Sequence, residues 1–169
     1  MTISPPARRG ATPPARPRAR AVGDVYLHPG EFAVACEPCT ITTILGSCVG
    51  VCLFDPTARL GGLNHFLLPT APPHDQSPRF GDVALRRLIQ SLECLGALRH
   101  RLSAKVVGGA CVLDVYRGGP GHIGQQNVRS ALRSLMEHGI AVTAMEVGGD
   151  RARKLRFRPD TGDLVVRMI

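Results

Sequence analysis

The sequence predicts an α/β (α+β) fold, in which several short strands are combined with two amphipathic helices. Three observations favour this class. β-Prone stretches recur along the chain, two segments show helical hydrophobic periodicity, and 19 Gly and 14 Pro imply many turns. Hydrophobic residues make up 44% of the 169 residues, which suits a packed core. Because aromatic residues amount to only 4%, that core must consist mainly of Leu, Val, Ala and Ile.

The strands are predicted from β-prone runs that turn residues interrupt. Gly46 and Ser47 break one run, and Asp55-Pro56 is a turn signal because Asp suits the first turn position and Pro presets the next φ. Gly61, Gly62 and Pro69 bound the following run. A glycine-rich loop is expected at 118–124. The predicted strands are 32–35, 40–45, 49–54, 63–68, 105–107, 140–147, 154–157 and 164–169.

Two helices are predicted from apolar residues spaced three and four apart. Asp82 is the expected N-cap of the first helix and Gly96 its C-terminal stop. Asn127 is the expected cap of the second helix, and Gly139 ends it. The apolar faces consist of Leu85, Leu88, Ile89, Leu92 and Leu95 in the first helix and of Val128, Ala131, Leu132, Leu135 and Met136 in the second.

The first 22 residues differ in composition from the rest of the chain. They hold five Arg, five Pro and no acidic residue, and so carry five of the eight net positive charges. Such a segment buries too little apolar area to offset its ordering entropy. We therefore expect a disordered tail at 1–22 and one folded domain at 23–169. No aromatic residue interleaves these arginines as single-strand binding would require, so nucleic acid is not an expected partner.

The chain shows no pattern typical of export or membrane insertion. The tail lacks the apolar core of a secretory signal, and no run reaches the roughly 18 apolar residues of a membrane-spanning helix. We therefore expect a cytoplasmic protein whose six cysteines are reduced, not disulfide-bonded. A zinc site built from Cys36, Cys39, Cys48 and Cys52 is disfavoured, because the spacing departs from that of zinc ribbons.

One pair of residues suggests catalytic chemistry. A four-residue turn at 55–58 between two antiparallel strands places Cys48 directly opposite His65, with Cβ atoms about 5 Å apart. A register shift of two residues leaves the pair diagonal, whereas a shift of one puts the side chains on opposite faces. A thiol beside an imidazole is a nucleophile–base unit, and Gly46-Ser47 leaves the sulfur accessible.

Spacing alone leaves alternatives open for this pair. Cys48 is equally consistent with a small buried side chain and His65 with a hydrogen-bonded core residue. Ser47 is a rival nucleophile, although a thiol is more readily ionised near neutral pH than a hydroxyl. If Cys48 is activated, it is expected to be the most rapidly alkylated of the six thiols.

The sequence segments around Cys48 and His65 resemble the signature of a known family. LGSCVGVCLFDP at 45–56 and GGLNHFLLP at 61–69 closely resemble CheD, the chemoreceptor glutamine deamidase family. The resemblance continues through RFGD at 79–82, KVVGGA at 105–110, IG at 123–124 with Asn127, VGG at 147–149, KLRF at 154–157 and TG at 161–162. It covers about 24–169 and omits only the tail.

The resemblance implies both a fold and a reaction. CheD proteins resemble the cytotoxic necrotizing factor-like cysteine hydrolases, with a layered α/β/β sandwich, and convert selected glutamines of methyl-accepting chemoreceptors to glutamate. The family's nucleophile falls on Cys48 and its histidine on His65. Its threonine, six residues before the cysteine, falls on Thr42, with Thr43 as the adjacent alternative.

The resemblance also implies the partners. These are the cytoplasmic domains of chemoreceptors and a CheC-type phosphatase, without a metal or cofactor and without membrane insertion. The reaction that the resemblance implies is amide hydrolysis through a thioester on Cys48. The alternative is a chemotaxis adaptor that binds receptors or the phosphatase without turnover. A protein acting only as an adaptor would tolerate loss of the Cys48 thiol.

Overall fold

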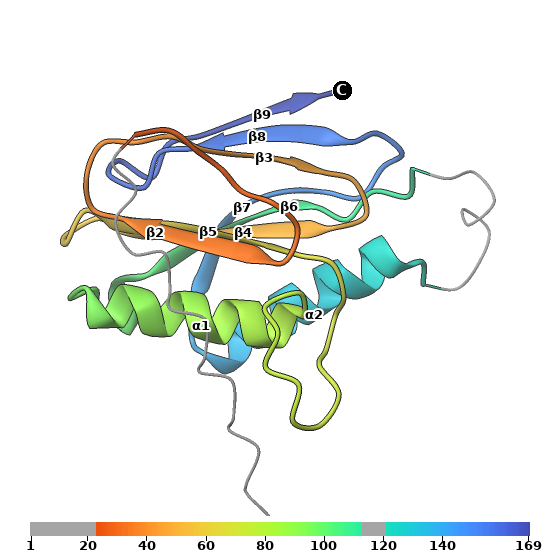
Figure 1. The fold of residues 1–169 in the computed structure, drawn as a ribbon, viewed down its shortest axis with the longest axis horizontal. Coiled ribbons are helices and arrows are strands. Elements are labelled where there is room, and N and C mark those ends of the chain that lie inside the picture. Colours follow the sequence, from red (N-terminus) through yellow and green to blue (C-terminus); the bar gives the residue numbers. More distant parts are fainter. Residues whose placement is uncertain (1–22, 113–120) are drawn as a thin grey trace, which may run out of the picture.

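The structure is a computed structural model that describes residues 23–112 and 121–169. The tail predicted at 1–22 and the first part of the glycine-rich loop predicted at 118–124 lie outside the described residues. The described chain forms two sheets and two α-helices, as the mixed α/β prediction requires (Figure 1).

The larger sheet has five strands in the order β2-β5-β4-β6-β7. Its first four strands are antiparallel to one another, and β7 pairs in parallel with β6. The central strand β4 begins directly after Cys48, so the sheet holds the backbone that follows the predicted nucleophile. The strands are β2 (Glu31–Ala35), β4 (Val49–Asp55), β5 (Leu60–Phe66), β6 (Ser103–Gly108) and β7 (Ala141–Val147).

The smaller sheet has four strands in the order β1-β3-β8-β9. The short β1 pairs in parallel with β3, and the other pairs are antiparallel. This sheet covers one face of the five-stranded sheet (Figure 1). Its strands are β1 (Val25–Tyr26), β3 (Ile41–Leu45), β8 (Arg153–Phe157) and β9 (Leu164–Met168).

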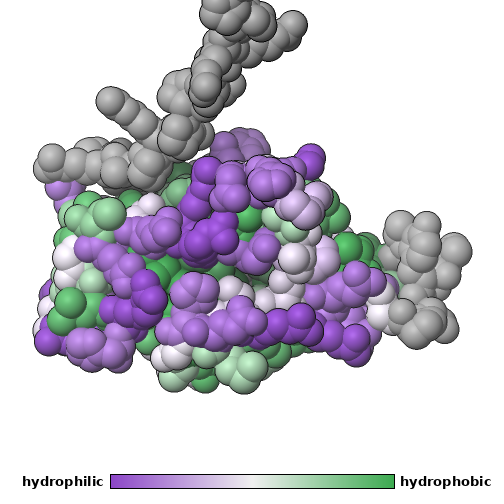
Figure 2. Space-filling model, turned by 90° about the horizontal axis from the view of Figure 1, so that it is seen from below, coloured by the Kyte–Doolittle hydropathy of each residue, from purple (hydrophilic) through white to green (hydrophobic). Residues whose placement is uncertain are grey.

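Helices α1 (Gly81–Cys94) and α2 (Ile123–Glu137) cover the other face of the five-stranded sheet (Figure 1). A 3₁₀ turn, η1 (Arg99–Arg101), precedes β6. Seen from the helix side, much of the surface is hydrophilic, as expected for helices whose apolar stripes face inward (Figure 2). Among the described residues, no helix is both long and apolar enough to cross a lipid bilayer.

The alternation of side chains in β4 divides the interior into two apolar layers. Val49, Val51 and Leu53 pack with the helices, whereas Cys52 packs against the four-stranded sheet. Each fully buried aliphatic side chain of these layers stabilises the fold by about 1.5–3 kcal/mol. The layer between the two sheets, which we call the inter-sheet layer, contains two of the three predicted site residues, Cys48 and His65.

The predicted start of the strand at 63–68 is wrong for a packing reason. β5 starts at Leu60, so Gly61 and Gly62 lie within the strand and do not end it. A Cβ atom at Gly61 would lie 2.6 Å from the Pro159 carbonyl oxygen, and one at Gly62 would lie 2.7 Å from Leu88. The glycines therefore mark places where neighbouring chain approaches closely.

The helix starts were also predicted incorrectly. Phe80 is the N-cap of α1, and Asp82 lies in its first turn. His122 caps α2 by accepting a hydrogen bond from the Gln125 N–H, so Asn127 lies inside the helix. Both C-terminal stops are confirmed, because Gly96 and Gly139 adopt positive φ angles of 105° and 69°.

Candidate active site

The β4–β5 hairpin places Cys48 and His65 on one face of the sheet, but not directly opposite each other. Gly50 is the cross-strand partner of His65, and Asp55 pairs with Leu60. The turn therefore has the predicted four residues but lies one position later, at 56–59, and the register is shifted by two residues. Continuing the register by one residue beyond Val49 puts Cys48 beside Leu67 and diagonal to His65.

A buried carboxylate explains the position of the turn. Asp55 accepts hydrogen bonds from the N–H groups of Thr57 and Ala58 at 2.9 and 3.0 Å, and from the N–H of Leu98 at 3.0 Å. Burial raises the pKa of the Asp55 carboxyl, but these donors outweigh it, and the pKa is lowered overall. The sequence identified Asp55 as a turn residue but not its bond to Leu98, which is distant in the chain.

His65 is held by a threonine of the other sheet. The Oγ1 atom of Thr43 lies 2.8 Å from Nδ1 of His65 and 2.8 Å from the Leu27 carbonyl oxygen. Both Thr43 and His65 are buried. The contact crosses the inter-sheet layer, so it depends on the stacking of β3 over β5.

Thr42, the predicted third site residue, does not make this contact. Alternation along β3 turns Thr42 to the outer face of the four-stranded sheet, where Arg156 is its cross-strand partner. Its carbonyl oxygen accepts the N–H of Leu27. The residue that contacts the imidazole is the adjacent alternative, Thr43.

This network assigns the tautomer of the ring. The Thr43 hydroxyl donates its one proton to the Leu27 carbonyl, and so it accepts from an N–H at Nδ1 of His65. The neutral ring then carries its lone pair on Nε2. That atom is buried and lacks a hydrogen-bond partner within the described structure. A buried, unpaired acceptor on the face shared with Cys48 is a candidate base.

Burial keeps this ring uncharged. Burial lowers the pKa of His65 to about 4, against a smaller opposing effect of the Leu27 carbonyl and of Glu31. At neutral pH the imidazole is therefore a neutral acceptor. His65 is only 2% exposed.

Cys48 is half-buried at the start of β4. Burial raises the pKa of its thiol, and its own backbone N–H acts in the opposite direction. The resting pair is therefore a thiol and a neutral imidazole, not a preformed thiolate–imidazolium pair. Its chemistry requires proton transfer from sulfur to Nε2 as the nucleophile attacks.

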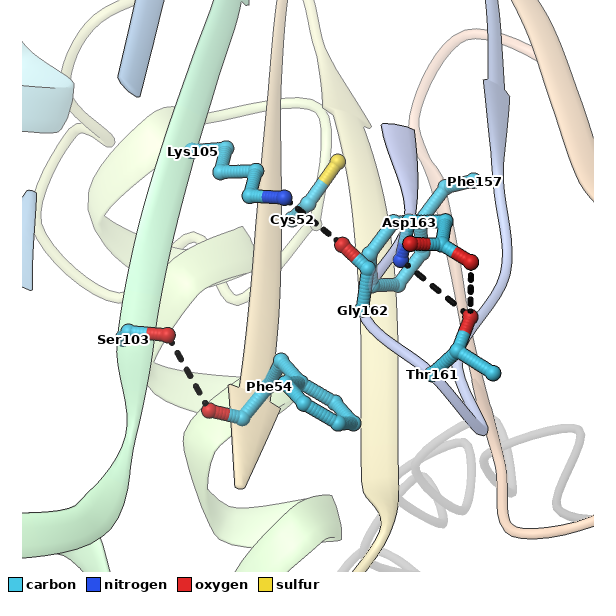
Figure 3. A pocket seen from close by; sticks show the side chains of 8 residues that line it. All are labelled: Cys52, Phe54, Ser103, Lys105, Phe157, Thr161, Gly162 and Asp163. Atoms are coloured by element: carbon cyan, nitrogen blue, oxygen red, sulfur yellow. Dashed lines mark hydrogen bonds between the residues drawn. The ribbon is translucent and has the colours of Figure 1, made fainter. Parts of the chain in front are cut away.

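A second cysteine lies on the same face of β4. Cys52 is fully buried, and it lines a pocket of about 190 Å³ together with Lys105, whose ammonium donates to the Gly162 carbonyl at 2.7 Å (Figure 3). Burial raises the pKa of the Cys52 thiol, and Lys105 offsets only part of this. This pocket contains a cation and a thiol but no histidine.

The cysteines considered for zinc are not gathered into one site. Cys36 is exposed, Cys48 is half-buried, and Cys39 and Cys52 are buried, and these four are free thiols. Across 23–112 and 121–169, no three His, Cys, Asp or Glu side chains form a group suited to a metal ion.

One residue near the site has a contact that the sequence analysis missed. Asn127 Nδ2 donates to the carbonyl oxygens of Ser47, at 3.1 Å, and Leu67, at 2.8 Å. The signal available in the sequence was a helix-cap residue type, and it was assigned to the helix end. Because Asn127 precedes the apolar stripe predicted for this helix, the spacing gave no signal of a buried contact, and only its place in the family resemblance singled it out.

A family model described as "CheD chemotactic sensory transduction" matches residues 67–168. The match starts directly after β5, two residues beyond His65. The chain is also 50% identical over 160 residues to the "Probable chemoreceptor glutamine deamidase CheD 1" of Anaeromyxobacter dehalogenans, which covers 95% of this chain and 91% of that protein.

Two further similarities have lower sequence identity. The chain is 43% identical over 149 residues to the "Probable chemoreceptor glutamine deamidase CheD" of Cereibacter sphaeroides, covering 87% of this chain and 73% of that one. Among solved structures it is similar to the Bacillus licheniformis hypothetical protein YfiH. That similarity has a TM-score of 0.46 and 13% identity over 68% of this chain and 49% of that chain.

Proposed function

This chain belongs to the CheD family, and we propose that it hydrolyses its substrate amide through Cys48 and His65, with Thr43 orienting the imidazole. It is a chemoreceptor glutamine deamidase of chemotaxis, a hydrolase whose substrates are chemoreceptors. The observation that supports the residue assignment is the buried Nε2 of His65, unpaired in the described structure, on the face that Cys48 shares.

The first half-reaction forms a thioester. The Cys48 sulfur attacks the side-chain carboxamide carbon of a glutamine while the thiol proton passes to Nε2 of His65. His65 then gives that proton to the departing nitrogen, the C–N bond breaks, and ammonia leaves. A γ-glutamyl thioester remains on Cys48. The low pKa of His65 suits this step, because an imidazolium in the buried layer readily gives up its proton.

The second half-reaction releases glutamate. Nε2 of His65 accepts a proton from water, whose oxygen attacks the thioester carbon. The C–S bond breaks, and the proton returns to the Cys48 sulfur. Thr43 keeps Nδ1 protonated in both steps, so the same ring nitrogen remains the base. The product carries a new negative charge, which changes the electrostatics of the receptor surface.

The cellular setting follows from the family resemblance. The substrates are glutamines in the cytoplasmic domains of methyl-accepting receptors, a CheC-type phosphatase is a second partner, and the protein works in the cytoplasm. The order of layers, helices then five-stranded sheet then four-stranded sheet, supports a fold of the cytotoxic necrotizing factor-like type (Figure 1).

The test is mass spectrometry of a receptor cytoplasmic fragment incubated with the purified protein. Amide-to-acid conversion at defined glutamines is expected with the unchanged chain and is expected to be absent with Cys48→Ala. Cys52→Ala is the matched control, because it removes the other thiol on the same face of β4. Deamidation that persists in a folded Cys48→Ala protein rules out the proposed nucleophile. A receptor fragment that is bound but left unchanged by the unmodified chain favours the adaptor role.

A further inference from the structure

Asn127 joins the segment that carries Cys48 to the strand that carries His65. It lies inside α2, is fully buried, and its Nδ2 donates to the carbonyls of both Ser47 and Leu67. Ser47 directly precedes the nucleophile, and Leu67 follows β5 two residues after His65. One amide group therefore connects both parts of the site to the helix layer.

The backbone around Cys48 is held at three consecutive carbonyls. The Gly46 carbonyl accepts the N–H of Ala110 at 2.9 Å, and the Cys48 carbonyl accepts the N–H of Gly109 at 2.8 Å. Between them, the Ser47 carbonyl is held by a side chain, that of Asn127. The orientation of the Ser47–Cys48 peptide therefore depends on this one side chain.

Close packing places α2 where Asn127 can reach. A Cβ atom at Gly124 would lie 2.5 Å from the carbonyl oxygen of Gly109, so glycine allows the first turn of α2 to approach the 108–110 loop. Asn127 is almost one turn further along the helix, on the same side. Its Oδ1 is buried without a hydrogen-bond partner in the described structure. A buried acceptor without a partner destabilises the fold by about 1–3 kcal/mol. A need for the two hydrogen bonds that Nδ2 donates would explain why an asparagine stands here despite this cost.

The Ser47 carbonyl determines where the N–H of Cys48 points. The described chain contains no cis peptide, so in the Ser47–Cys48 peptide the C=O and the N–H point in opposite directions. With the carbonyl directed at Asn127, the N–H is directed away from α2. Within the described residues no backbone carbonyl accepts it. As the backbone N–H of the nucleophile itself, it is a donor available to a group bound at the Cys48 sulfur.

We propose that Asn127 is a positioning residue, which fixes the Ser47–Cys48 peptide so that the Cys48 N–H donates to the oxyanion formed from the substrate carboxamide. The inference rests on the proposed function, because an oxyanion forms only if Cys48 attacks a carbonyl carbon. The hydrogen bond to the Ser47 carbonyl also polarises the peptide and strengthens its N–H as a donor.

The test compares Asn127→Ala with Ser130→Ala. Ser130 is three residues further along α2 and donates to the Pro69 carbonyl, so it also ties the helix to the segment after β5 but does not touch Ser47. Asn127→Ala is expected to lower kcat for ammonia release by about 10- to 100-fold with little change in KM, somewhat less than the loss of an oxyanion donor. Ser130→Ala is expected to stay within about twofold, because it affects no group at the site.

Alkylation of Cys48 by iodoacetamide separates positioning from general disruption. Displacement of iodide forms no oxyanion, so Asn127→Ala should label at the unchanged rate while deamidation falls. Equal losses of labelling and kcat would overturn the proposal, as would a normal kcat or an equal effect of Ser130→Ala. These outcomes differ from a failure of the proposed function, because in that case the Cys48→Ala variant would itself retain deamidation.

Asn127→Asp is the second variant if Asn127→Ala fails to fold. It preserves the volume, but its carboxyl donates a hydrogen bond only when protonated. Its kcat relative to that of the unchanged protein should therefore rise as the pH falls below neutrality. A ratio that does not change with pH, in protein shown to be folded by its melting curve, would contradict the proposal.

Discussion

Cys48 and Cys52 lie on the same face of one sheet, but only Cys48 shares its end of that face with a candidate base. Both face the inter-sheet layer. Cys52 is fully buried, with Leu63 and Lys105 as its cross-strand partners, and Lys105 is already bonded to Gly162 (Figure 3). Cys48 lies just before the strand, half-buried, on the face of an imidazole whose Nε2 is unpaired in the described structure.

Under the proposed mechanism, a nearby cation is not enough to make a cysteine reactive. Burial raises the pKa of both thiols, and Lys105 offsets only part of the effect on Cys52. Two features distinguish Cys48. It shares its face with an imidazole whose Nε2 is unpaired in the described structure, and its sulfur belongs to a half-buried residue. Substrate can reach a half-buried sulfur, whereas Cys52 has no exposed surface of that kind.

The largest expected effect is the loss of the base. His65→Ala should lower ammonia release from a receptor fragment by at least about 100-fold, since this ring carries both proton transfers. Melting curves must show that the variant is folded, because the removed side chain is buried. Lys105→Ala is the matched control at the other end of the layer, and it should retain activity. Near-normal turnover by a folded His65→Ala protein would assign the proton transfer to another group.

The second prediction concerns stability in acid. The pKa of His65 is about 4 in the folded protein against 6.5 for the free side chain. Between these values the unfolded chain binds a proton that the folded protein does not, so stability falls as the pH falls from about 6.5 to 4. The contribution lost is about 3 kcal/mol.

Urea denaturation across this range is the measurement. A His65→Gln variant should lose less stability on acidification than the unchanged protein, while both titrate the same carboxylates. Parallel pH dependences in the two proteins would show that the buried ring is not the cause.

The third prediction compares the two thiols directly. Iodoacetamide should label Cys48 at least about tenfold faster than Cys52 in the folded protein, because a thiolate must form and be accessible. The His65→Ala variant should reduce this difference, since Nε2 accepts the thiol proton. Peptide mapping after short exposures measures both rates. Faster labelling of Cys52 would reverse the comparison, and the exposed Cys94 provides a reference for an ordinary thiol.

The smallest expected effect distinguishes two adjacent threonines. Thr43→Val removes one hydrogen bond to His65 and should lower kcat by about tenfold, the equivalent of roughly 1.4 kcal/mol for a bond within a buried network. Thr42→Val alters the outer face of the four-stranded sheet and should change kcat by less than about twofold. A larger effect of Thr42→Val would restore the residue chosen from the family spacing.

The amino-acid sequence alone predicted the candidate nucleophile and base and most of the secondary structure. Apolar spacing predicted both helices because a helix must place one stripe on the core, and Gly96 and Gly139 end them as predicted. The residues around Cys48 and His65 suggested a nucleophile and a base. Strand alternation placed both on one face, even with the register shifted by two residues.

The further groups of the candidate site became visible in the tertiary structure alone. Thr43 reaches His65 across the gap between two sheets, and Asn127 reaches Ser47 from a helix 80 residues further along the chain. No local sequence pattern predicts either contact, because both depend on how the layers of the fold stack. Burial is likewise a property of the packed layers, and it is burial that makes His65 a neutral base. Local spacing determines which face a side chain takes, whereas packing determines what it meets there.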